Sequence, residues 1–345
     1  MKWRIKGYSK NTNRDDHSKK QIANEMIRGK YMITKNKKSE KEIIEMIRKT
    51  FPDRSVERIQ ELTEGMCNVT YNISFCDGEE CILKIAPKDT TGNTSNEIQL
   101  MAAEIRAMQL VREHCSFKVA DVLAYDDTKS ICDGDYFFME KLKGMNYIFV
   151  KDKLPAEVNC MIQREIGEIS RQLCEITNPK FGFLGDERRY DSLSDFVQTM
   201  LQNLITDGQK KSVDLGCDIK QLMEEFEKEK QIFDEVSLAT LVHWDMWEGN
   251  VFVEDNHVSG IIDWERALWG EAFMDDRFRK HNRNKDFLEG FGRQNFSKTE
   301  LKRLRWYDII LYLTMMVEVF YREFEDERQY HWAKEQLLNV LKESI

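Results

Sequence analysis

Two short stretches place polar side chains at the ends of apolar runs: LVHWDMWEGNVFV at 241–253 and GIIDWE at 260–265. Beside buried strands, Asp245, Asn250 and Asp263 would be costly unless a ligand occupies them. A carboxylate, an amide five residues later and a second carboxylate beyond a hairpin suit phosphoryl transfer. One Asp orients the acceptor hydroxyl, while the Asn and the other Asp hold Mg²⁺ on the phosphates through hard oxygen atoms. The spacing therefore predicts a phosphotransferase site.

The same chemistry requires an upstream strand lysine that grips the nucleotide phosphates and a helix carboxylate that aims it. Lys84 lies in the expected strand CILKIA, and Glu104 lies on the helix that we expect to follow. Glu97 is the alternative partner, because a spacing of seven residues places it on the same helix face. The turn GMCN, from Gly65 to Asn68, lies between the first two strands, and its backbone N–H groups and Asn side chain are suited to phosphate oxygens.

The element that carries Lys84 is predicted to be the second strand of a hairpin. Residues 69–75 alternate apolar and polar side chains, and an Asp-Gly turn at 77–78 leads into CILKIA. A period of two places Lys84 on the face of Ile82, opposite the other apolar residues. The simpler explanation of a mid-strand lysine is a gatekeeper charge on an edge strand.

Helical patterns surround and follow this hairpin. The segment from Ser39 to residue 51 predicts an amphipathic helix whose capping box is formed by Ser39 and Glu42, and residues 97–114 form a second helical pattern. YFFMEKLKG is typical of a buried strand that runs into a connector. Beyond it, only two short strands around the polar stretches are expected to interrupt helices. These helices are predicted at 156–176, 191–206, 217–235 and 299–342.

These elements predict an α+β fold of two lobes. We expect an N-terminal nucleotide-binding lobe at 32–142 and a C-terminal catalytic and substrate-binding lobe at 143–345. Residues 1–31 hold nine Lys or Arg against three Asp or Glu and show no apolar periodicity, so we expect a disordered basic leader. Translation from Met32 is a further hypothesis, which mass spectrometry of the native protein would decide.

Charge and composition narrow the choice of partners. The formal net charge is −9, and the basic leader contributes +6 to it (nine Lys or Arg minus three Asp or Glu), so the rest of the chain carries about −15 and is acidic. An acidic surface argues against nucleic acid and is compatible with a cationic acceptor, although it equally serves solubility. The chain has neither an apolar run of membrane-spanning length nor the apolar core of a signal peptide, so we expect no membrane partner. Eight cysteines without a CxxC pair indicate a reducing compartment, and a cytoplasmic location is expected.

Five segments, in order and spacing, resemble the aminoglycoside phosphotransferase family of small-molecule kinases with a bilobal protein-kinase-like fold. They are EGMCNVTYNI, CILKIAP, YFFMEKLKG, LVHWDMWEGNVFV and GIIDWERALWGEAFMD, within a resemblance that covers residues 35–345. The resemblance implies ATP or GTP as phosphoryl donor and Mg²⁺ as cofactor. Asp245 would be the catalytic Asp, with Asn250 and Asp263 as Mg²⁺ ligands. Lys84 would contact the α- and β-phosphates and Glu104 would pair with Lys84.

The resemblance also assigns the adenine contact and leaves the acceptor open. The backbone of the hinge, which includes Met139, Glu140 and Leu142, would meet adenine. Trp244 stands where many members have Gly and is expected to narrow or repack the pocket floor. The acceptor is therefore an aminoglycoside-like compound or another hydroxyl compound such as choline, an amino alcohol, a sugar or a macrolide.

A second departure from the family pattern is GEAFMD, which replaces the commoner GDPxxD, so Glu271 and Ala272 stand in place of Asp and Pro. Acidic residues in this half either meet an amine-bearing acceptor or form a solvated face. They are Glu271, Asp275, Asp276 and Glu289. The resemblance indicates a structural role for Asp275.

Two alternatives belong to other classes of protein. A hydrolase metal site could use His243, Asp245, His257 and Asp263, although His257 falls in a hairpin turn and no further ligand cluster accompanies it. A nucleotide-binding scaffold without catalysis is the other alternative, but it would not need the whole set of phosphoryl-transfer residues. The sequence does not fix the oligomeric state.

Overall fold

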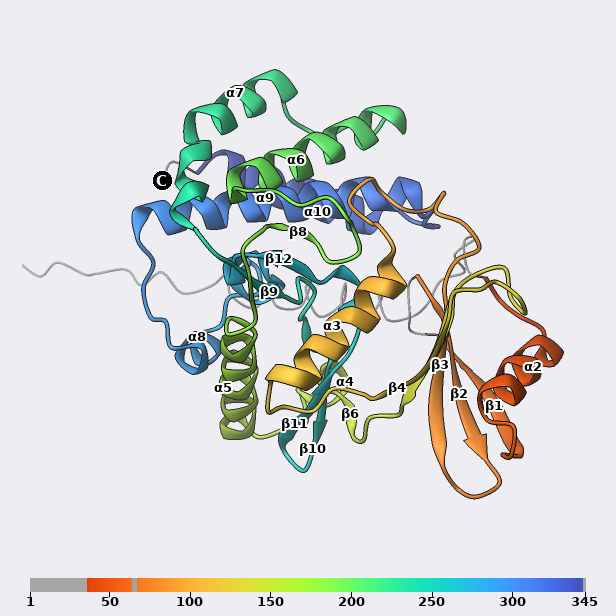
Figure 1. Cartoon of the computed structure of the whole chain (residues 1–345). Coiled ribbons are helices and arrows are strands. Elements are labelled where there is room, and N and C mark those ends of the chain that lie inside the picture. The colour runs from red at the N-terminus through yellow and green to blue at the C-terminus, as the bar shows by residue number, and fades with distance from the viewer. Residues whose placement is uncertain (1–35, 64–66, 344–345) are drawn as a thin grey trace, which may run out of the picture.

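The computed structural model describes residues 36–63 and 67–343 (Figure 1). The expected leader, Met32 and Gly65 lie outside the described residues. The N-terminal lobe is a five-stranded antiparallel sheet in the order β1-β2-β3-β5-β4. Its strands are β1 (Val56–Leu62), β2 (Val69–Phe75), β3 (Glu80–Ile85), β4 (Val122–Asp126) and β5 (Tyr136–Glu140).

Helix α2 (Glu40–Thr50) covers one face of this sheet. The predicted capping box is confirmed, because Ser39 and Glu42 each bond the other's backbone N–H. Ile43 and Ile47 are buried in an apolar cluster with the inward side chains of β2, β3 and β5. Helix α3 (Leu100–His114) belongs to a second cluster, which includes Ile82 and continues into the C-terminal lobe. The central strands β3 and β5 are therefore buried on both faces of the sheet.

Strand β3 shows why a lysine stands in mid-strand. It is the third of five strands, so the edge-strand explanation of Lys84 is wrong. The lysine side chain is buried and lies on the Ile82 face, as the period-two pattern predicted. Because an unpaired buried ammonium is unfavourable, the strand requires a partner for Lys84 beneath the sheet.

Helix α3 begins later than the sequence pattern predicted. The helix starts at Leu100, and Gln99 before it has a left-handed backbone with a φ of 44°. Glu97 lies in the loop before the helix, where its carboxylate accepts from Thr94 N at 2.9 Å and from Thr94 Oγ1 at 3.2 Å. These local bonds compete with helix formation, so Glu97 does not share a helix face with Glu104.

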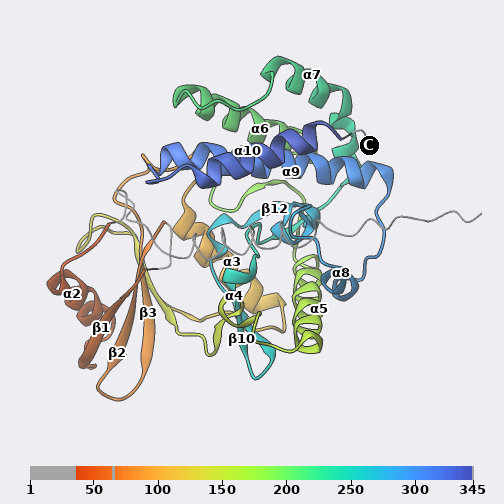
Figure 2. The ribbon, with the colours of Figure 1, turned by 180° about the vertical axis from the view of Figure 1, so that it is seen from behind.

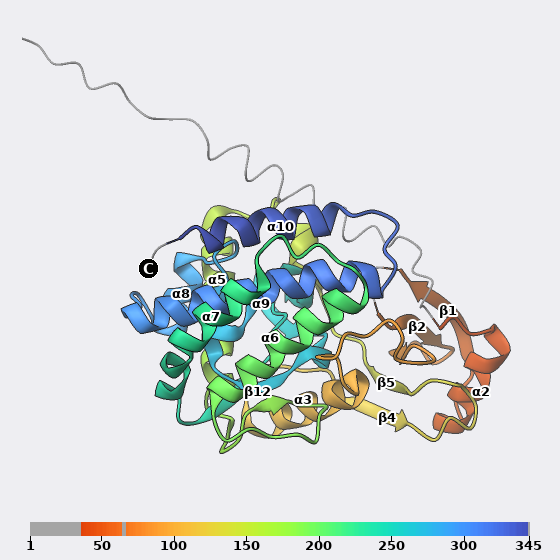
Figure 3. The ribbon, with the colours of Figure 1, turned by 90° about the horizontal axis from the view of Figure 1, so that it is seen from above.

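The C-terminal lobe is mostly helical, as predicted. Its helices are α4 (Tyr147–Val150), α5 (Ala156–Leu173), α6 (Leu193–Lys210), α7 (Ile219–Glu229), α8 (Lys285–Phe291), α9 (Lys298–Tyr321) and α10 (Arg328–Leu341). The single helix expected at 299–342 is wrong, because the chain turns back between α9 and α10. Helices α6, α9 and α10 lie side by side in both further views (Figures 2 and 3). Among the described residues, no helix is long and apolar enough to cross a membrane.

Helix α8 was not predicted. It packs against α5 with the two backbones in close contact. A Cβ added at Gly167 would lie 2.2 Å from Phe287 O, and one at Gly290 would lie 2.0 Å from Arg164 O. Glycines at both positions let the two helices approach more closely than side chains would permit.

Two small sheets hold the polar stretches, so the expectation of only two strands in this lobe was incomplete. One sheet has the order β11-β10-β6 and the other has the order β7-β9-β12-β8. Their strands are β6 (Met145–Asn146), β7 (Thr177–Asn178), β8 (Gly182–Phe183), β9 (Ala239–Val242), β10 (Val251–Glu254), β11 (His257–Ile261) and β12 (Leu268–Gly270). Short 3₁₀ turns lie between these elements, and one of them directly follows Asp263. The turns are η1 (Lys230–Glu235), η2 (Glu248–Asn250), η3 (Trp264–Arg266), η4 (Ala272–Met274) and η5 (Asp276–Phe278). The loop from β9 to β10 and the loop from β11 to β12 therefore emerge beside one another.

Candidate active site

His243 joins the two loops. Its ring is fully buried, and Nε2 lies 2.9 Å from the backbone oxygen of Ile262, next to Asp263. Its Nδ1 lies 3.2 Å from the backbone N of Asp245, which donates to it. A carbonyl only accepts and a backbone N–H only donates, so these partners require the neutral tautomer with its hydrogen on Nε2. His243 thus sets the spacing between the loops of Asp245 and Asp263.

This histidine predicts a pH dependence of stability. Burial lowers the pKa of His243 to about 4, well below the ordinary value. The unfolded chain therefore binds more protons between pH 4 and 6.5, and stability falls as pH is lowered through this window, by up to about 3 kcal/mol. We expect the free energy of unfolding of His243→Gln, measured with urea, to lack the part of this pH dependence that comes from His243. The pH dependence due to other titrating groups should remain. Parallel stability profiles for the two proteins would contradict the assignment.

Asp245 and Asn250 face each other across the loop from β9 to β10. The amide Nδ2 of Asn250 donates to the backbone oxygen of Asp245 at 2.8 Å and lies 3.3 Å from its carboxylate. Asn250 is buried, whereas Asp245 is partly exposed. Desolvation raises the pKa of Asp245 well above its ordinary range; Arg266 opposes this shift, and the carboxylate of Asp276 adds to it. A carboxyl with a raised pKa in a partly open position is suited to proton transfer.

Lys84 brings the two lobes together. Its Nζ lies 2.6 Å from Glu104 Oε1 and also contacts Asp263 Oδ1 from the C-terminal lobe. The Lys84 side chain is 6% exposed, while that of Asp263 keeps 36% of its surface open. The structure thus brings the predicted strand lysine, helix glutamate and second aspartate together, and the aspartate remains accessible.

Negative charge exceeds positive charge among Lys84, Glu104 and Asp263, because two carboxylates share one ammonium. Burial alone would lower the pKa of Lys84, but Asp263 and Glu104 outweigh it, so the pKa is raised above its ordinary value. Burial raises the pKa of Glu104, and the attraction of Lys84 offsets this only in part because Asp263 competes for the same ammonium. A further cation at the exposed Asp263 would relieve this excess of negative charge.

The donor set fits Mg²⁺. No group of three or more His, Cys, Asp or Glu side chains suited to a metal occurs within 36–63 and 67–343. Mg²⁺ does not require such a group, since proteins commonly hold it through one or two carboxylates together with substrate phosphates. The exposed carboxylate of Asp263 and the amide oxygen of Asn250 are hard donors on adjoining loops.

The hydrolase site considered from the sequence is wrong. His243 has both ring nitrogens bonded to backbone groups. His257 starts β11, keeps 62% of its side-chain surface open and contacts Glu165 Oε1 at 2.5 Å. The two histidines therefore do not converge on the aspartates.

The expected phosphate loop is described only from Cys67 onward. Asn68 is buried, and its Nδ2 donates to Glu265 Oε2 at 2.9 Å. This bond joins the loop to the residue two positions beyond Asp263. The side-chain amide nitrogen of Asn68 therefore already has a partner in Glu265. Gly65 lies outside the described residues.

The expected hinge begins in β5 with Met139 and Glu140 and continues to Leu142 beyond it. Met139 and Leu142 have buried side chains in the apolar cluster that continues into the C-terminal lobe. The Glu140 backbone N donates to the backbone oxygen of Asp121, the residue before β4, at 2.8 Å. An adenine contact through backbone N–H groups would therefore fall to Lys141 or Leu142, while Glu140 is engaged in the sheet.

Trp244, which is expected to narrow or repack the pocket floor, packs its indole in the apolar core. The residue is only 9% exposed, and its ring lies 5.8 Å from that of Phe183. Its backbone has a φ of 70°, and its N–H donates to Asp275 Oδ2 at 2.9 Å. This left-handed backbone explains why Gly suits the position. The contact also agrees with a structural role for Asp275.

The left-handed backbone of Trp244 can be tested by comparing the stability of two variants, Trp244→Ala and Trp244→Gly. Trp244→Ala and Trp244→Gly both remove the buried indole, at a cost of about 3–5 kcal/mol. Gly additionally relieves the left-handed backbone, which costs other residues about 1–2 kcal/mol. We therefore expect urea unfolding to find the Gly variant about 1 kcal/mol more stable than the Ala variant. Equal stability, or a more stable Ala variant, would contradict this account.

The acidic residues of the C-terminal lobe are not a free anionic face for an amine. Glu271 is buried and accepts from Arg303 Nη2 at 2.9 Å and from Tyr307 Oη at 2.7 Å. Asp276 is buried and accepts from Asn282 Nδ2 at 2.6 Å. Glu289 is exposed and accepts from Arg164 Nε at 3.1 Å. With Asp275 bonded to Trp244 N, all four have internal partners. The solvated-face interpretation is therefore wrong for the buried Glu271, Asp275 and Asp276 and holds for the exposed Glu289.

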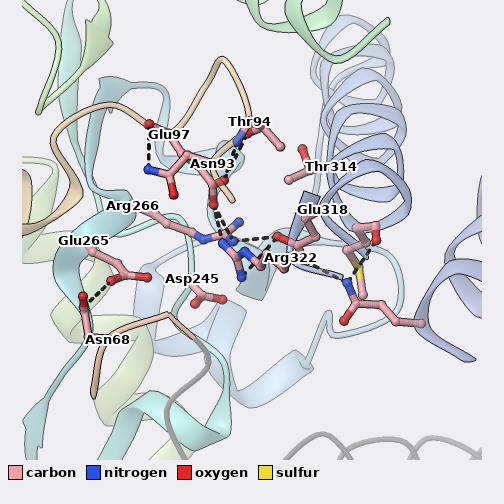
Figure 4. Close-up of polar contacts among 12 residues, drawn as sticks. Asn68, Asn93, Thr94, Glu97, Asp245, Glu265, Arg266, Thr314, Glu318 and Arg322 are labelled. Atoms are coloured by element: carbon pink, nitrogen blue, oxygen red, sulfur yellow. Dashed lines mark hydrogen bonds and ion pairs between the residues drawn. The ribbon is translucent and has the colours of Figure 1, made fainter. Parts of the chain in front are cut away.

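A charge cluster that the sequence did not predict lies beside Asp245 and is formed by Glu97, Arg266, Glu318 and Arg322 (Figure 4). Arg266 Nη2 lies 2.7 Å from Glu318 Oε2 and 3.2 Å from Glu97 Oε1. Arg322 also contacts Glu97. The only sequence signal for this cluster is that Arg266 lies three residues after Asp263, because the other members come from distant segments.

A lysine–glutamate pair under the sheet of one lobe, facing an Asp-Asn-Asp set on two loops of the other, is the arrangement of kinase-fold phosphotransferases. The chain belongs to the phosphotransferase enzyme family, whose model matches residues 58–275. No curated protein is significantly similar in sequence.

Solved structures share the fold at low sequence identity. A thermostable mutant of the aminoglycoside phosphotransferase APH(4)-Ia is 16% identical over 88% of this chain and 98% of its own, with a TM-score of 0.61. A candidate fructosamine-3-kinase from Haemophilus somnus 129PT is 14% identical over 87% and 97%, with a TM-score of 0.65. The streptomycin-ATP complex of APH(2")-IIa is 13% identical over 88% and 97%, with a TM-score of 0.56. The fold is therefore the predicted bilobal protein-kinase-like fold.

Proposed function

We propose that this protein transfers the γ-phosphoryl group of ATP or GTP, with Mg²⁺, to a hydroxyl group of a small molecule. The observation that carries the proposal is the position of Lys84, which contacts Glu104 in its own lobe and Asp263 in the other. A phosphotransferase needs these groups together, because it must hold the nucleotide and its metal between the lobes. A protein that only packs its core would gain little from burying such a cluster.

In this mechanism each residue has a distinct task. Lys84 holds the α- and β-phosphates, and Glu104 keeps its Nζ directed toward them. Asp263 and Asn250 would hold Mg²⁺ through their side-chain oxygens, and the metal would neutralise phosphate charge. Asp245 orients the acceptor hydroxyl and takes up its proton, and His243 keeps the Asp245 loop in register with Asp263.

The donor and acceptor classes are supported by similar proteins. A thermostable APH(4)-Ia mutant has been crystallised with AMP-PNP and hygromycin B, and APH(2")-IIa with ATP and streptomycin. The candidate fructosamine-3-kinase has a sugar-derived substrate in its name. We therefore propose an amino or sugar alcohol as acceptor, with aminoglycosides first. The alternative is a kinase of the same fold that acts on choline, a sugar or a macrolide.

A direct phosphoryl-transfer assay tests this function. The full chain should transfer ³²P from γ-labelled ATP or GTP to at least one compound in a panel of aminoglycosides, macrolides, amino alcohols and sugars. Omission of Mg²⁺ should abolish the transfer. Nucleotide binding without transfer to any acceptor would instead favour the catalytically silent scaffold.

A further inference from the structure

The segment 94–97 connects the lobes at a point away from the hinge. It follows β3 in the N-terminal lobe, yet its contacts are with helices of the C-terminal lobe. Ser95 donates to the carboxylate of Asp207 twice, from its backbone N at 2.6 Å and from Oγ at 2.8 Å. Asp207 lies on α6, and its side chain is 1% exposed. A buried carboxylate that accepts two bonds from one residue holds that residue firmly.

The neighbours of Ser95 are bound to the same lobe. Asn96 Nδ2 donates to Met200 O on α6 at 3.1 Å, and its Oδ1 accepts from Asn203 at 2.8 Å. Glu97 forms ion pairs with Arg266 of η3 and with Arg322, the residue that follows α9 (Figure 4). Three consecutive residues are thus bound to α6, to the end of α9 and to η3.

Asp207 is itself held in place. Tyr321 Oη on α9 lies 3.1 Å from Asp207 Oδ1, and Lys210 Nζ lies 3.4 Å from the same atom. Further along the segment, a Cβ added at Gly185 would lie 2.0 Å from Ile98 O, so the chain runs closely over the turn after β8. The contacts of Ser95, Asn96 and Glu97 with the C-terminal lobe, here called the anchor, are therefore supported by two helices and one turn.

Helix α3 starts three residues after this anchor, at Leu100, and no side chain caps its first turn. Its fifth residue is Glu104, which holds Lys84. Only two residues separate Glu97 from Leu100. The anchor therefore limits where α3 begins and how closely the Glu104 carboxylate approaches Lys84. We infer that Asp207 is a positioning residue for the nucleotide site, which acts through the segment 94–97 and α3 on the Glu104–Lys84 pair. This inference rests on the proposed function.

Two variants of Asp207 and one control test the inference. Asp207→Ala removes all acceptors for Ser95, while Asp207→Asn keeps one carbonyl oxygen. Asp308→Asn is the control, because Asp308 is an equally buried aspartate whose contacts are with Lys280 N and Arg279. Hydrogen exchange of the α3 amides in the full chain gives a readout that needs no activity.

We expect α3 exchange about 10-fold faster in Asp207→Ala, the size of losing a charge-assisted bond, and a smaller change in Asp207→Asn. The KM for ATP should rise about 10-fold in Asp207→Ala while the acceptor KM stays within about twofold. In Asp308→Asn, α3 exchange should match the wild type. Should Asp207→Ala fail to fold, Ser95→Ala removes only the hydroxyl bond, and its α3 exchange should be about 3-fold faster.

Unchanged α3 exchange in folded Asp207 and Ser95 variants would overturn the inference and would mean that packing against η3 alone positions α3. Equal acceleration in Asp308→Asn would also overturn it, because the effect would then be general destabilisation. If the wild type transfers phosphate to no acceptor but Asp207→Ala still accelerates α3 exchange, the proposed function fails and the anchoring of α3 stands.

Discussion

Replacing Asp245 with Asn should lower kcat by about 10²–10⁴ while the KM for the nucleotide changes by no more than a few-fold, because the residue acts on the acceptor hydroxyl. Asn keeps the size of the side chain, and the Asn250 bond to the backbone oxygen of residue 245 does not depend on it. The variant should be at least as stable as the wild type, since burial and Asp276 make an ionised carboxylate unfavourable here. Initial rates at saturating acceptor, with thermal unfolding in parallel, measure both effects.

The matched control for this variant is Asp191→Asn. Asp191 is in the same lobe, and its side chain is 85% exposed and paired with Lys180. We expect wild-type kinetics, because an exposed ion pair contributes little. A kcat for Asp245→Asn within threefold of the wild type would remove Asp245 from the role of base. A large rise in nucleotide KM with unchanged kcat would place it on the donor side instead.

Local patterns predicted much of the N-terminal lobe and of the candidate site. The capping box at Ser39 and Glu42 and the alternation around Lys84 each concern residues within a few positions of one another. Period two decided the face of Lys84, and burial on both faces of the sheet then required a partner for it. That partner, Glu104, was predictable because the order of strand, loop and helix leaves few carboxylates that can reach.

Long-range contacts explain what the sequence could not predict. Glu97 looked helical, yet its carboxylate bonds Thr94 locally and Arg322 across more than 200 positions of sequence. Glu271 looked solvent-exposed, yet Arg303 and Tyr307 from α9 bury it. No periodicity encodes such pairs, because each depends on how whole helices are placed relative to the loops. The same reason hid the left-handed backbone of Trp244, whose N–H is bound by Asp275.

Asp263 has an unusual backbone, which decides how its variants must be chosen. Its φ is 61° and its ψ is 57°, a left-handed conformation that Asp and Asn adopt more readily than Ala. Asp263→Ala would therefore combine loss of the carboxylate with backbone strain of about 1 kcal/mol or more. Asp263→Asn suits the left-handed backbone and keeps one side-chain oxygen while it removes the charge. The Asn variant therefore isolates the electrostatic role, whereas Asp263→Ala adds both the backbone strain and the loss of that oxygen.

Asp263→Asn should reduce the affinity for Mg-ATP by about 10²-fold or more, since it removes the most exposed carboxylate beside Lys84 and with it the charge that attracts the metal. Titration calorimetry measures this directly, and chelation of Mg²⁺ from the wild type should give a similarly weak affinity. Metal-free ATP should bind the variant no worse than it binds the wild type, because Lys84 loses a competing carboxylate and keeps Glu104. Tight Mg-ATP binding by the variant would show that the metal lies elsewhere. Equal weakening with and without Mg²⁺ would instead assign Asp263 to the placement of Lys84.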